Sequence, residues 1–225
     1  HRIMSYKEDF IHLMLKSDVL KFGDFKTKSG RMSPYFINTG FFNNSEEIAK
    51  LGDFYAKAYM DNIKLDKPLL FGPAYKGIPL VVSCAVSLYK NYGLEIGYSF
   101  NRKEAKDHGE KGIFVGETPN ADSDVVIIED VITAGTAVRE SIDILKHYDA
   151  KVKALIISVN RMERGSGDKS AIHELEDDYG VKVYSILDIK FIADYLRNKE
   201  IDGKVYIDEE MYAKIMKHLD TYKER

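Results

Sequence analysis

Residues 125–137 read VVIIEDVITAGTA, a run of apolar residues followed by two acids and a short turn that contains glycine. The first four residues, Val125 to Ile128, are all β-branched, which is typical of a strand buried on both faces. Such strands belong to parallel sheets that helices cover on both sides. The Thr-Ala-Gly-Thr sequence at 133–136 then favours a turn that opens a helix. The segment therefore predicts a strand, a turn and a helix in that order.

The polar part of this segment suits a sugar phosphate. Its turn can direct backbone N–H groups and two threonine hydroxyls at an anion bound at the helix N-terminus. Glu129 and Asp130, directly before the turn, can accept hydrogen bonds from sugar hydroxyls or hold a hydrated Mg²⁺. Together these groups predict a site for a ribose 5-phosphate. The alternative is an acidic strand end followed by an ordinary threonine N-cap, with no ligand.

The rest of the chain alternates between strand and helix patterns. Helices are expected at 5–17, 44–62, 78–89, 137–148, 170–179, 189–196 and after Asp208. Strands are expected at 69–71, 96–100, 125–128, 154–159 and 183–186, and as a pair within 19–40 that is joined by a turn at 28–31. This order predicts one α/β domain over residues 1–225, with a mostly parallel central sheet flanked by helices.

Composition and charge exclude several classes of protein. The 225 residues carry a net charge of −3, so no chain-wide electrostatic attraction to nucleic acid or membrane is expected. The single cysteine, Cys84, excludes an internal disulfide framework and suits a reducing compartment, so we expect a cytoplasmic protein. The longest nearly apolar stretch, 77–89, is too short to span a bilayer.

A second turn with anion-binding character follows the strand at 69–71. Residues 72–77 read GPAYKG, two glycines around a lysine between a strand and a helix. Backbone N–H groups and the Lys76 ammonium could bind a phosphate here. Taken alone the signal is weak, because glycine-proline turns that carry a lysine are common.

Two further segments carry cations next to predicted strand ends. Residues 101–112 read NRKEAKDHGEKG, a basic loop that could neutralise and cover an anionic leaving group, although a solvated hairpin tip has the same composition. Residues 159–165 read VNRMERG, in which Arg161 could bind a carboxylate through two parallel hydrogen bonds. The alternative for Arg161 is a surface arginine on a loop.

The segment 125–137 resembles the 5-phosphoribosyl 1-pyrophosphate (PRPP) motif of the type I phosphoribosyltransferase family, and 72–77 resembles its pyrophosphate loop. The segments 28–36, KSGRMSPYF, and 101–109, NRKEAKDHG, resemble the orotate branch of that family. The resemblance implies the type I phosphoribosyltransferase fold, with the N-terminal helix and hairpin, about 5–40, as a hood-like region that helps to bind the base. It also implies transfer of the phosphoribosyl group from PRPP to N1 of orotate, giving orotidine 5′-monophosphate and pyrophosphate in pyrimidine biosynthesis.

The resemblance further implies a role for each matching residue. PRPP would contact Lys28, Tyr75, Lys76, Arg102, Lys103, Lys106, His108, Glu129, Asp130, Val131, Ile132, Thr133, Ala134, Gly135, Thr136 and Ala137. Orotate would contact Lys28, Phe36, Ile37, Thr133 and Arg161, and the catalytic contacts would come from Lys106, Asp130, Arg102 and His108. Two positions depart from the family pattern: Ile37 replaces a common second aromatic residue, and Glu129 stands where aspartate is frequent.

The resemblance also implies a cofactor and a partner. Mg²⁺ would be held by PRPP and water rather than directly by the protein, and the protein would form a homodimer in which the 102–112 loop reaches the neighbouring active site. A non-proline cis peptide bond, which is rare elsewhere, is expected between Ala74 and Tyr75. Two alternatives stay open: a phosphoribosyltransferase for another base, and a regulatory protein that keeps the PRPP fold as a sensor and binds nucleic acid.

Overall fold

The computed structural model describes residues 3–104 and 112–225, which form two compact units. The hairpin unit contains the chain up to residue 43 together with 159–170 and 187–225. The sheet unit contains 44–158 and 171–186. Lys106 and His108, two of the expected pyrophosphate contacts, lie outside the described residues.

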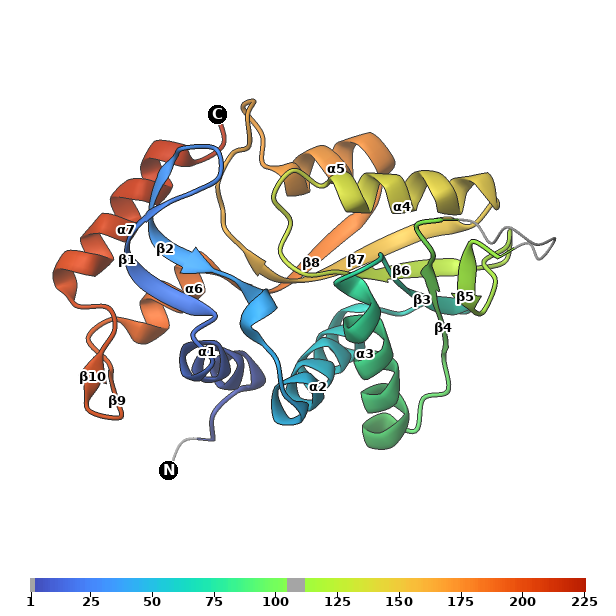
Figure 1. The fold of residues 1–225 in the computed structure, drawn as a ribbon, viewed down its shortest axis with the longest axis horizontal. Coiled ribbons are helices and arrows are strands. Elements are labelled where there is room, and N and C mark those ends of the chain that lie inside the picture. Colours follow the sequence, from blue (N-terminus) through green and yellow to red (C-terminus); the bar gives the residue numbers. More distant parts are fainter. Residues whose placement is uncertain (1–2, 105–111) are drawn as a thin grey trace. The chain divides into compact units, whose positions relative to one another are not determined.

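A six-stranded sheet is the centre of the sheet unit, with the strand order β5-β4-β3-β6-β7-β8 (Figure 1). The strands are β3 (Pro68–Gly72), β4 (Gly97–Asn101), β5 (Phe114–Gly116), β6 (Asp124–Ile128), β7 (Lys151–Asn160) and β8 (Lys182–Asp188). β3 pairs in parallel with both β4 and β6, and β6 pairs in parallel with β7, whereas β5 runs antiparallel to β4. The predicted mostly parallel sheet is confirmed.

Helices cover both faces of this sheet, as the β-branched central strands require. Figure 1 shows α2 (Ser45–Asn62) and α3 (Gly77–Tyr92) on one face, and α4 (Thr136–His147) and α5 (Ala171–Tyr179) on the other. Phe71, Ile127 and Leu155 from neighbouring strands are buried in one cluster with Leu145 of α4 and Leu175 of α5. Fully buried side chains of this size supply most of the hydrophobic stabilisation of such a unit.

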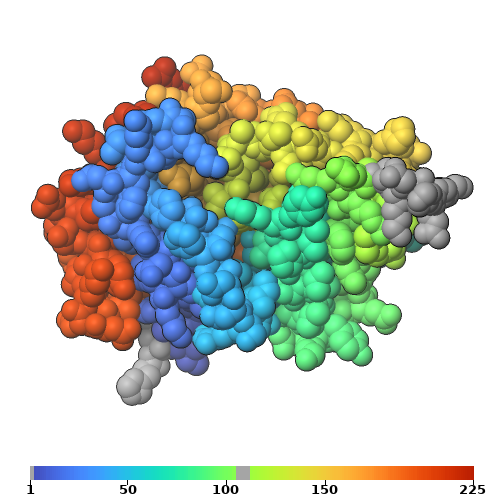
Figure 2. All heavy atoms as spheres, viewed as in Figure 1, coloured from blue at the N-terminus to red at the C-terminus, as the bar shows by residue number. Residues whose placement is uncertain are grey.

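The pair α2 and α3 packs closely because of one glycine. A Cβ atom at Gly52 of α2 would lie 2.5 Å from the Ser83 carbonyl oxygen of α3, so only glycine allows this approach. In Figure 2 the cyan atoms of α2 and the teal atoms of α3 lie side by side at the surface. The outer face of α3 exposes Val86 and Tyr89.

The hairpin unit is built from segments far apart in the sequence. Its elements are α1 (Tyr6–Lys16), β1 (Leu20–Lys26), β2 (Met32–Ile37), the 3₁₀ helix η1 (Thr39–Phe41), α6 (Ile189–Leu196), β9 (Glu200–Ile201), β10 (Lys204–Val205) and α7 (Glu209–Tyr222). β1 and β2 form an antiparallel hairpin, and α7 packs against β2. Ser5 and Asp208 cap α1 and α7 by accepting the backbone N–H three residues on, as their sequence positions predict.

The predicted helices and strands are confirmed, with a few differences, among them the 3₁₀ helix η1, which was not expected. β7 begins at Lys151, three residues before the expected strand. The expected start was too late because the exposed Lys151 and Lys153 interrupt the apolar pattern at the beginning of β7. β5 and the short β9–β10 pair were not predicted, since two or three residues are too few to show a period. Among residues 3–104 and 112–225, no helix has both the length and the apolar character that crossing a membrane requires.

Candidate active site

The turn after β6 has the form of an anion site. Gly135 is the N-cap residue of α4 and has φ +79°, in the left-handed region that favours glycine. A glycine N-cap has no side chain to accept from the first backbone N–H groups, and no acidic residue lies in the first turn of α4. The positive end of this helix is therefore available to an anion beside the exposed Thr133 and Thr136. The alternative of an ordinary threonine N-cap is wrong.

Glu129 and Asp130 lie next to this turn and are both 8% exposed. The Asp130 backbone N–H donates to Glu129 Oε1 at 3.0 Å, and the Tyr55 hydroxyl donates to the Glu129 carbonyl oxygen at 2.6 Å. Burial raises the pKa of Glu129 to about 7; the negative Asp130 adds to the rise, whereas the Asp130 N–H bond and Lys76 oppose it. Two adjacent buried carboxylates of this kind can accept hydrogen bonds from two neighbouring hydroxyls.

The 72–77 loop lies beside the end of β6. β3 and β6 are neighbouring parallel strands, so their carboxyl ends meet at one edge of the sheet. A Cβ atom at Gly77 would lie 3.1 Å from the Ile128 carbonyl oxygen, and one at Gly72 would overlap the Gly77 carbonyl oxygen. Glycine at both positions thus lets this loop pack against its own helix and against the strand that precedes Glu129.

The loop also has the expected cis peptide bond between Ala74 and Tyr75. Its backbone is fixed by the Ala74 N–H, which donates to the buried Asn101 Oδ1 at 3.0 Å. Tyr75 is 69% exposed, and Lys76 is exposed beside it. Both side chains are therefore available to a ligand.

The basic segment begins where β4 ends, one strand away from the 72–77 loop. Arg102 Nη1 donates to the Gly112 carbonyl oxygen at 2.7 Å, and the Arg102 N–H donates to the Ile113 carbonyl oxygen at 2.6 Å. The Lys103 ammonium lies 5.3 Å from the centre of the Tyr75 ring, within the range of a cation–π contact. The structure thus brings Tyr75, Lys76, Lys103, Glu129 and the 133–136 turn to one edge of the sheet unit.

The remaining expected contacts belong to the hairpin unit. Lys28 is exposed in the turn between β1 and β2, and Phe36 and Ile37 are half-buried at the end of β2. The Phe36 ring packs between Phe25 and Phe41, with ring centres 5.4 and 6.2 Å away.

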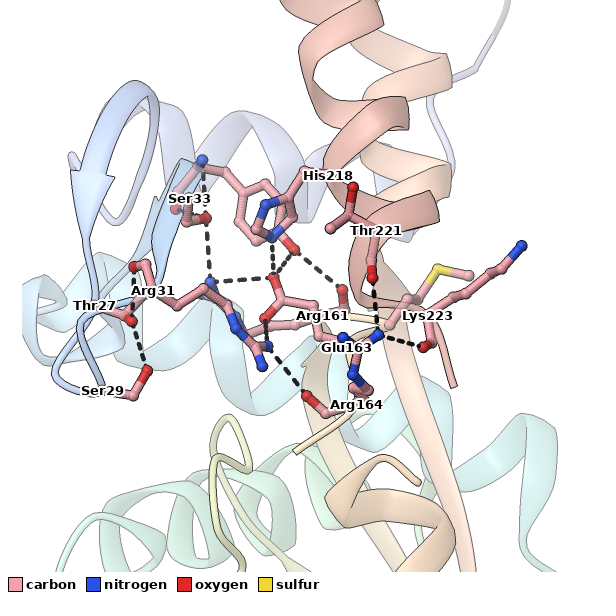
Figure 3. A network of polar contacts seen from close by, with 12 residues as sticks. Thr27, Ser29, Arg31, Ser33, Arg161, Glu163, Arg164, His218, Thr221 and Lys223 are labelled. Atoms are coloured by element: carbon pink, nitrogen blue, oxygen red, sulfur yellow. Dashed lines mark hydrogen bonds and ion pairs between the residues drawn. The ribbon is translucent and has the colours of Figure 1, made fainter. Parts of the chain in front are cut away.

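Arg161 of the hairpin unit lies in a polar network that the sequence did not predict (Figure 3). Its guanidinium lies over the Tyr35 ring, 4.7 Å from the centre, and Nη2 is 3.6 Å from Glu163 Oε1. Glu163 in turn accepts hydrogen bonds from Tyr35 and from His218 of α7. Glu163 lies two residues from Arg161 in the sequence, so its closeness to Arg161 could have been predicted. No local sequence pattern indicates the contact of Glu163 with His218, which lies 55 residues further along the chain.

The comparisons with known proteins agree with this geometry. Residues 40–195 match the family model described as the phosphoribosyl transferase domain. The orotate phosphoribosyltransferase of Clostridium acetobutylicum is 51% identical over 218 residues, 96% of this chain and 97% of that protein, and the one of Proteus mirabilis is 50% identical over 87% and 90%. A crystal structure of orotate phosphoribosyltransferase from Francisella tularensis matches with a TM-score of 0.83 and 37% identity, covering 96% of this chain and 99% of that one. The chain therefore belongs to the phosphoribosyl transferase family, in the branch of the orotate phosphoribosyltransferases.

Proposed function

We propose that this chain transfers the 5-phosphoribosyl group of PRPP to N1 of orotate through the site at the edge of the sheet unit. The observation that carries the proposal is the joint presence of two buried adjacent carboxylates and an uncapped helix N-terminus directly after one strand. That arrangement offers acceptors for ribose hydroxyls beside a donor site for the 5-phosphate. The full-length similarity to orotate phosphoribosyltransferases supports orotate as the base.

The PRPP contacts divide into three groups. The N–H groups and hydroxyls of 133–136 bind the 5-phosphate, and Glu129 and Asp130 accept hydrogen bonds from the ribose hydroxyls. Pyrophosphate is bound by Tyr75, Lys76, Arg102, Lys103, Lys106 and His108. The closeness of Lys103 to Tyr75 supports this third group, whereas Lys106 and His108 rest on the family resemblance.

The orotate contacts are assigned to Lys28, Phe36, Ile37, Thr133 and Arg161. Phe36 and Ile37 offer apolar surface to a flat ring, and Arg161 is the cation for the orotate carboxylate. The N-terminal helix and hairpin, about 5–40, contribute these base contacts within one phosphoribosyltransferase domain.

The chemistry needs little proton transfer from the protein. As pyrophosphate leaves C1 of the ribose, positive charge develops at that carbon, and orotate N1 attacks from the opposite face. Lysines and arginines neutralise the charge on the leaving group, and Asp130 holds the ribose in place, so catalysis comes from positioning and electrostatics. Lys106 is our first choice for the leaving-group contact.

Phosphoribosyltransferases generally use Mg²⁺ with PRPP. The residues here fit an ion that PRPP and water hold, because the Glu129 and Asp130 carboxylates beside the proposed pyrophosphate contacts can accept hydrogen bonds from a hydrated Mg²⁺. When bound with PRPP, Mg²⁺ would neutralise charge on the departing pyrophosphate.

A homodimer and a cytoplasmic location complete the proposal. In the family the 102–112 loop reaches the neighbouring active site, so Lys106→Ala and Asp130→Asn should each be inactive alone. Mixing the two variants should restore part of the activity through hybrid dimers. No recovery after proven subunit exchange would contradict contact in trans. The single cysteine supports a reducing compartment.

The deciding experiment follows the ultraviolet absorbance of orotate on mixing the protein with PRPP and Mg²⁺, with and without EDTA. A loss of orotate signal that EDTA abolishes, with orotidine 5′-monophosphate identified as the product, is the expected result. No change from folded protein that binds PRPP would refute orotate as the base. Thermal protection by other free bases in the presence of PRPP would then identify the substrate.

A further inference from the structure

Glu163 is the centre of a buried network within the hairpin unit. Its side chain is 11% exposed and that of His218 is 7% exposed. Glu163 Oε1 accepts from the Tyr35 hydroxyl and lies 2.7 Å from His218 Nε2, while Arg161 Nη2 and Arg31 Nη1 each lie 3.6 Å from a carboxylate oxygen. Figure 3 shows the Glu163 carboxylate among the labelled side chains of Arg31, Arg161 and His218.

The hydrogen bonds and charges around Glu163 determine its ionisation state and which of its neighbours donate to it. Burial raises the pKa of Glu163, but the hydrogen bonds from His218 and Tyr35 and the charge of Arg161 outweigh it and lower that pKa to about 2. Glu163 is therefore ionised at neutral pH and can only accept hydrogen bonds, so His218 Nε2 must carry a proton. The two arginines outnumber the ionised Glu163, so these three side chains together carry one net positive charge. An incoming carboxylate meets an attractive field.

Arg161 is held on three sides. Its guanidinium stacks on the Tyr35 ring, Nη2 lies 3.4 Å from Ser33 Oγ, and Nη2 also lies near Glu163 Oε1. The Tyr35 hydroxyl lies 3.2 Å from the Arg161 carbonyl oxygen, which fixes the backbone as well. A long arginine side chain loses considerable rotamer freedom when it binds a ligand, and contacts that restrict it beforehand reduce that loss.

The backbone between Arg161 and Glu163 brings their side chains together. Met162 has φ +58°, in the left-handed region that is unfavourable for a non-glycine residue. The Met162 N–H donates to Asn160 Oδ1 at 2.8 Å, which supports this turn. Residues two apart on a strand would both lie on one face, with their Cα atoms about 6–7 Å apart. The turn instead lets Glu163 approach the Arg161 guanidinium itself.

We propose that Glu163, held by Tyr35 of β2 and His218 of α7, is a positioning residue that fixes the Arg161 guanidinium for the orotate carboxylate. The proposal rests on the proposed contact between Arg161 and orotate. It makes the C-terminal helix, remote in sequence from every recognised motif, a determinant of orotate affinity.

The test compares kcat and the KM values for orotate and PRPP in E163Q, H218A and H218Q. In E163Q the amide oxygen can still accept from Tyr35 and His218, but the charge that orients Arg161 is lost. We expect KM for orotate to rise about 3- to 10-fold, with kcat and KM for PRPP within about twofold of the starting protein. H218A should show a similar rise. In H218Q, which keeps a hydrogen-bond donor for Glu163, KM for orotate should return most of the way to the value of the starting protein.

A double-mutant cycle separates this proposal from the proposed function. R161A alone should raise KM for orotate strongly, and E163Q should add nothing further in the R161A background, because Glu163 acts through Arg161. An unchanged KM for orotate in R161A would refute the orotate contact itself. A raised KM in R161A together with an unchanged KM in E163Q would refute only the positioning role. Additive effects would also refute it.

A control variant makes the same chemical change elsewhere in the hairpin unit. E209Q removes the exposed ion pair with Arg197, 2.8 Å long, from the start of α7. It should leave KM for orotate unchanged. If E163Q does not fold, the H218A and H218Q pair decides. A loss of thermal stability in H218A with no selective change in KM for orotate overturns the proposal.

Discussion

The raised pKa of Glu129 predicts a measurable dependence of stability on pH. Ionising this buried carboxylate is unfavourable in the folded protein and easy in the unfolded chain. With the folded pKa at about 7 and an ordinary value of 4.5, the neutral form of Glu129 stabilises the fold at low pH. That stabilisation is fully present below pH 4.5 and is lost as the pH rises through 7.

The magnitude follows from the two pKa values. Between pH 5 and pH 8, linkage gives a loss of about 2.5 kcal/mol in the free energy of unfolding from this group alone. Glu129→Gln has nearly the same shape, keeps an acceptor for the Asp130 N–H and does not titrate. The free energy of unfolding of the variant minus that of the starting protein should therefore increase by about 2–3 kcal/mol from pH 5 to pH 8.

The assay is urea unfolding of both proteins at pH 5, 6, 7 and 8 without ligand, followed by fluorescence and by circular dichroism. Titration of the other groups is common to both proteins and cancels in the difference between them. A difference in the free energy of unfolding that stays constant within about 0.5 kcal/mol from pH 5 to pH 8 would refute the reasoning, because linkage requires a slope. Loss of PRPP binding in the same variant would show that the carboxylate is kept for function rather than stability.

Three further predictions concern the sheet unit, to which Glu129 belongs. KM for PRPP should fall as the pH rises through about 7, because only ionised Glu129 accepts hydrogen bonds fully from the ribose hydroxyls, and a flat profile in initial-rate measurements would contradict this. Gly52→Ala should destabilise the protein by about 1–3 kcal/mol in urea unfolding, since its Cβ would lie 2.5 Å from the Ser83 carbonyl oxygen; an unchanged midpoint would show that α2 and α3 can separate freely. Tyr55→Phe should lower the free energy of unfolding by about 1–2 kcal/mol, because it leaves the buried Glu129 carbonyl oxygen without its 2.6 Å hydrogen bond, and a stability equal to that of the starting protein would indicate that another donor takes the place of Tyr55.

Much of the sheet unit can be predicted from local sequence. Val125–Ile128 predict a doubly buried strand, and the structure buries all four side chains fully. The turn chemistry at 133–136 and 72–77 predicts two anion sites, and the alternation of strands and helices requires parallel pairing. Parallel neighbours bring their carboxyl ends to one edge, so Glu129, Tyr75 and Lys76 come together by topology alone.

The hairpin unit shows where local pattern stops being sufficient. The apolar pattern of the helix that carries His218, with the buried Ile215, predicts only packing. In the structure the His218 ring forms a hydrogen bond with Glu163, 55 residues earlier in the chain. No local sequence pattern around Arg161 predicts that its guanidinium lies over the ring of Tyr35, which belongs to a hairpin 126 residues earlier.

The sequence alone was enough to predict the sheet and the two glycine turns, because hydrophobic period, turn residues and helix ends act over a few neighbouring residues. The phosphoribosyltransferase chemistry was implied by the resemblance of its motifs to that family. The tertiary structure alone decided which side chains hold Arg161 and that burial raises the pKa of Glu129. Both depend on the packing of segments far apart in the chain, which sets distances and desolvation that no local pattern encodes.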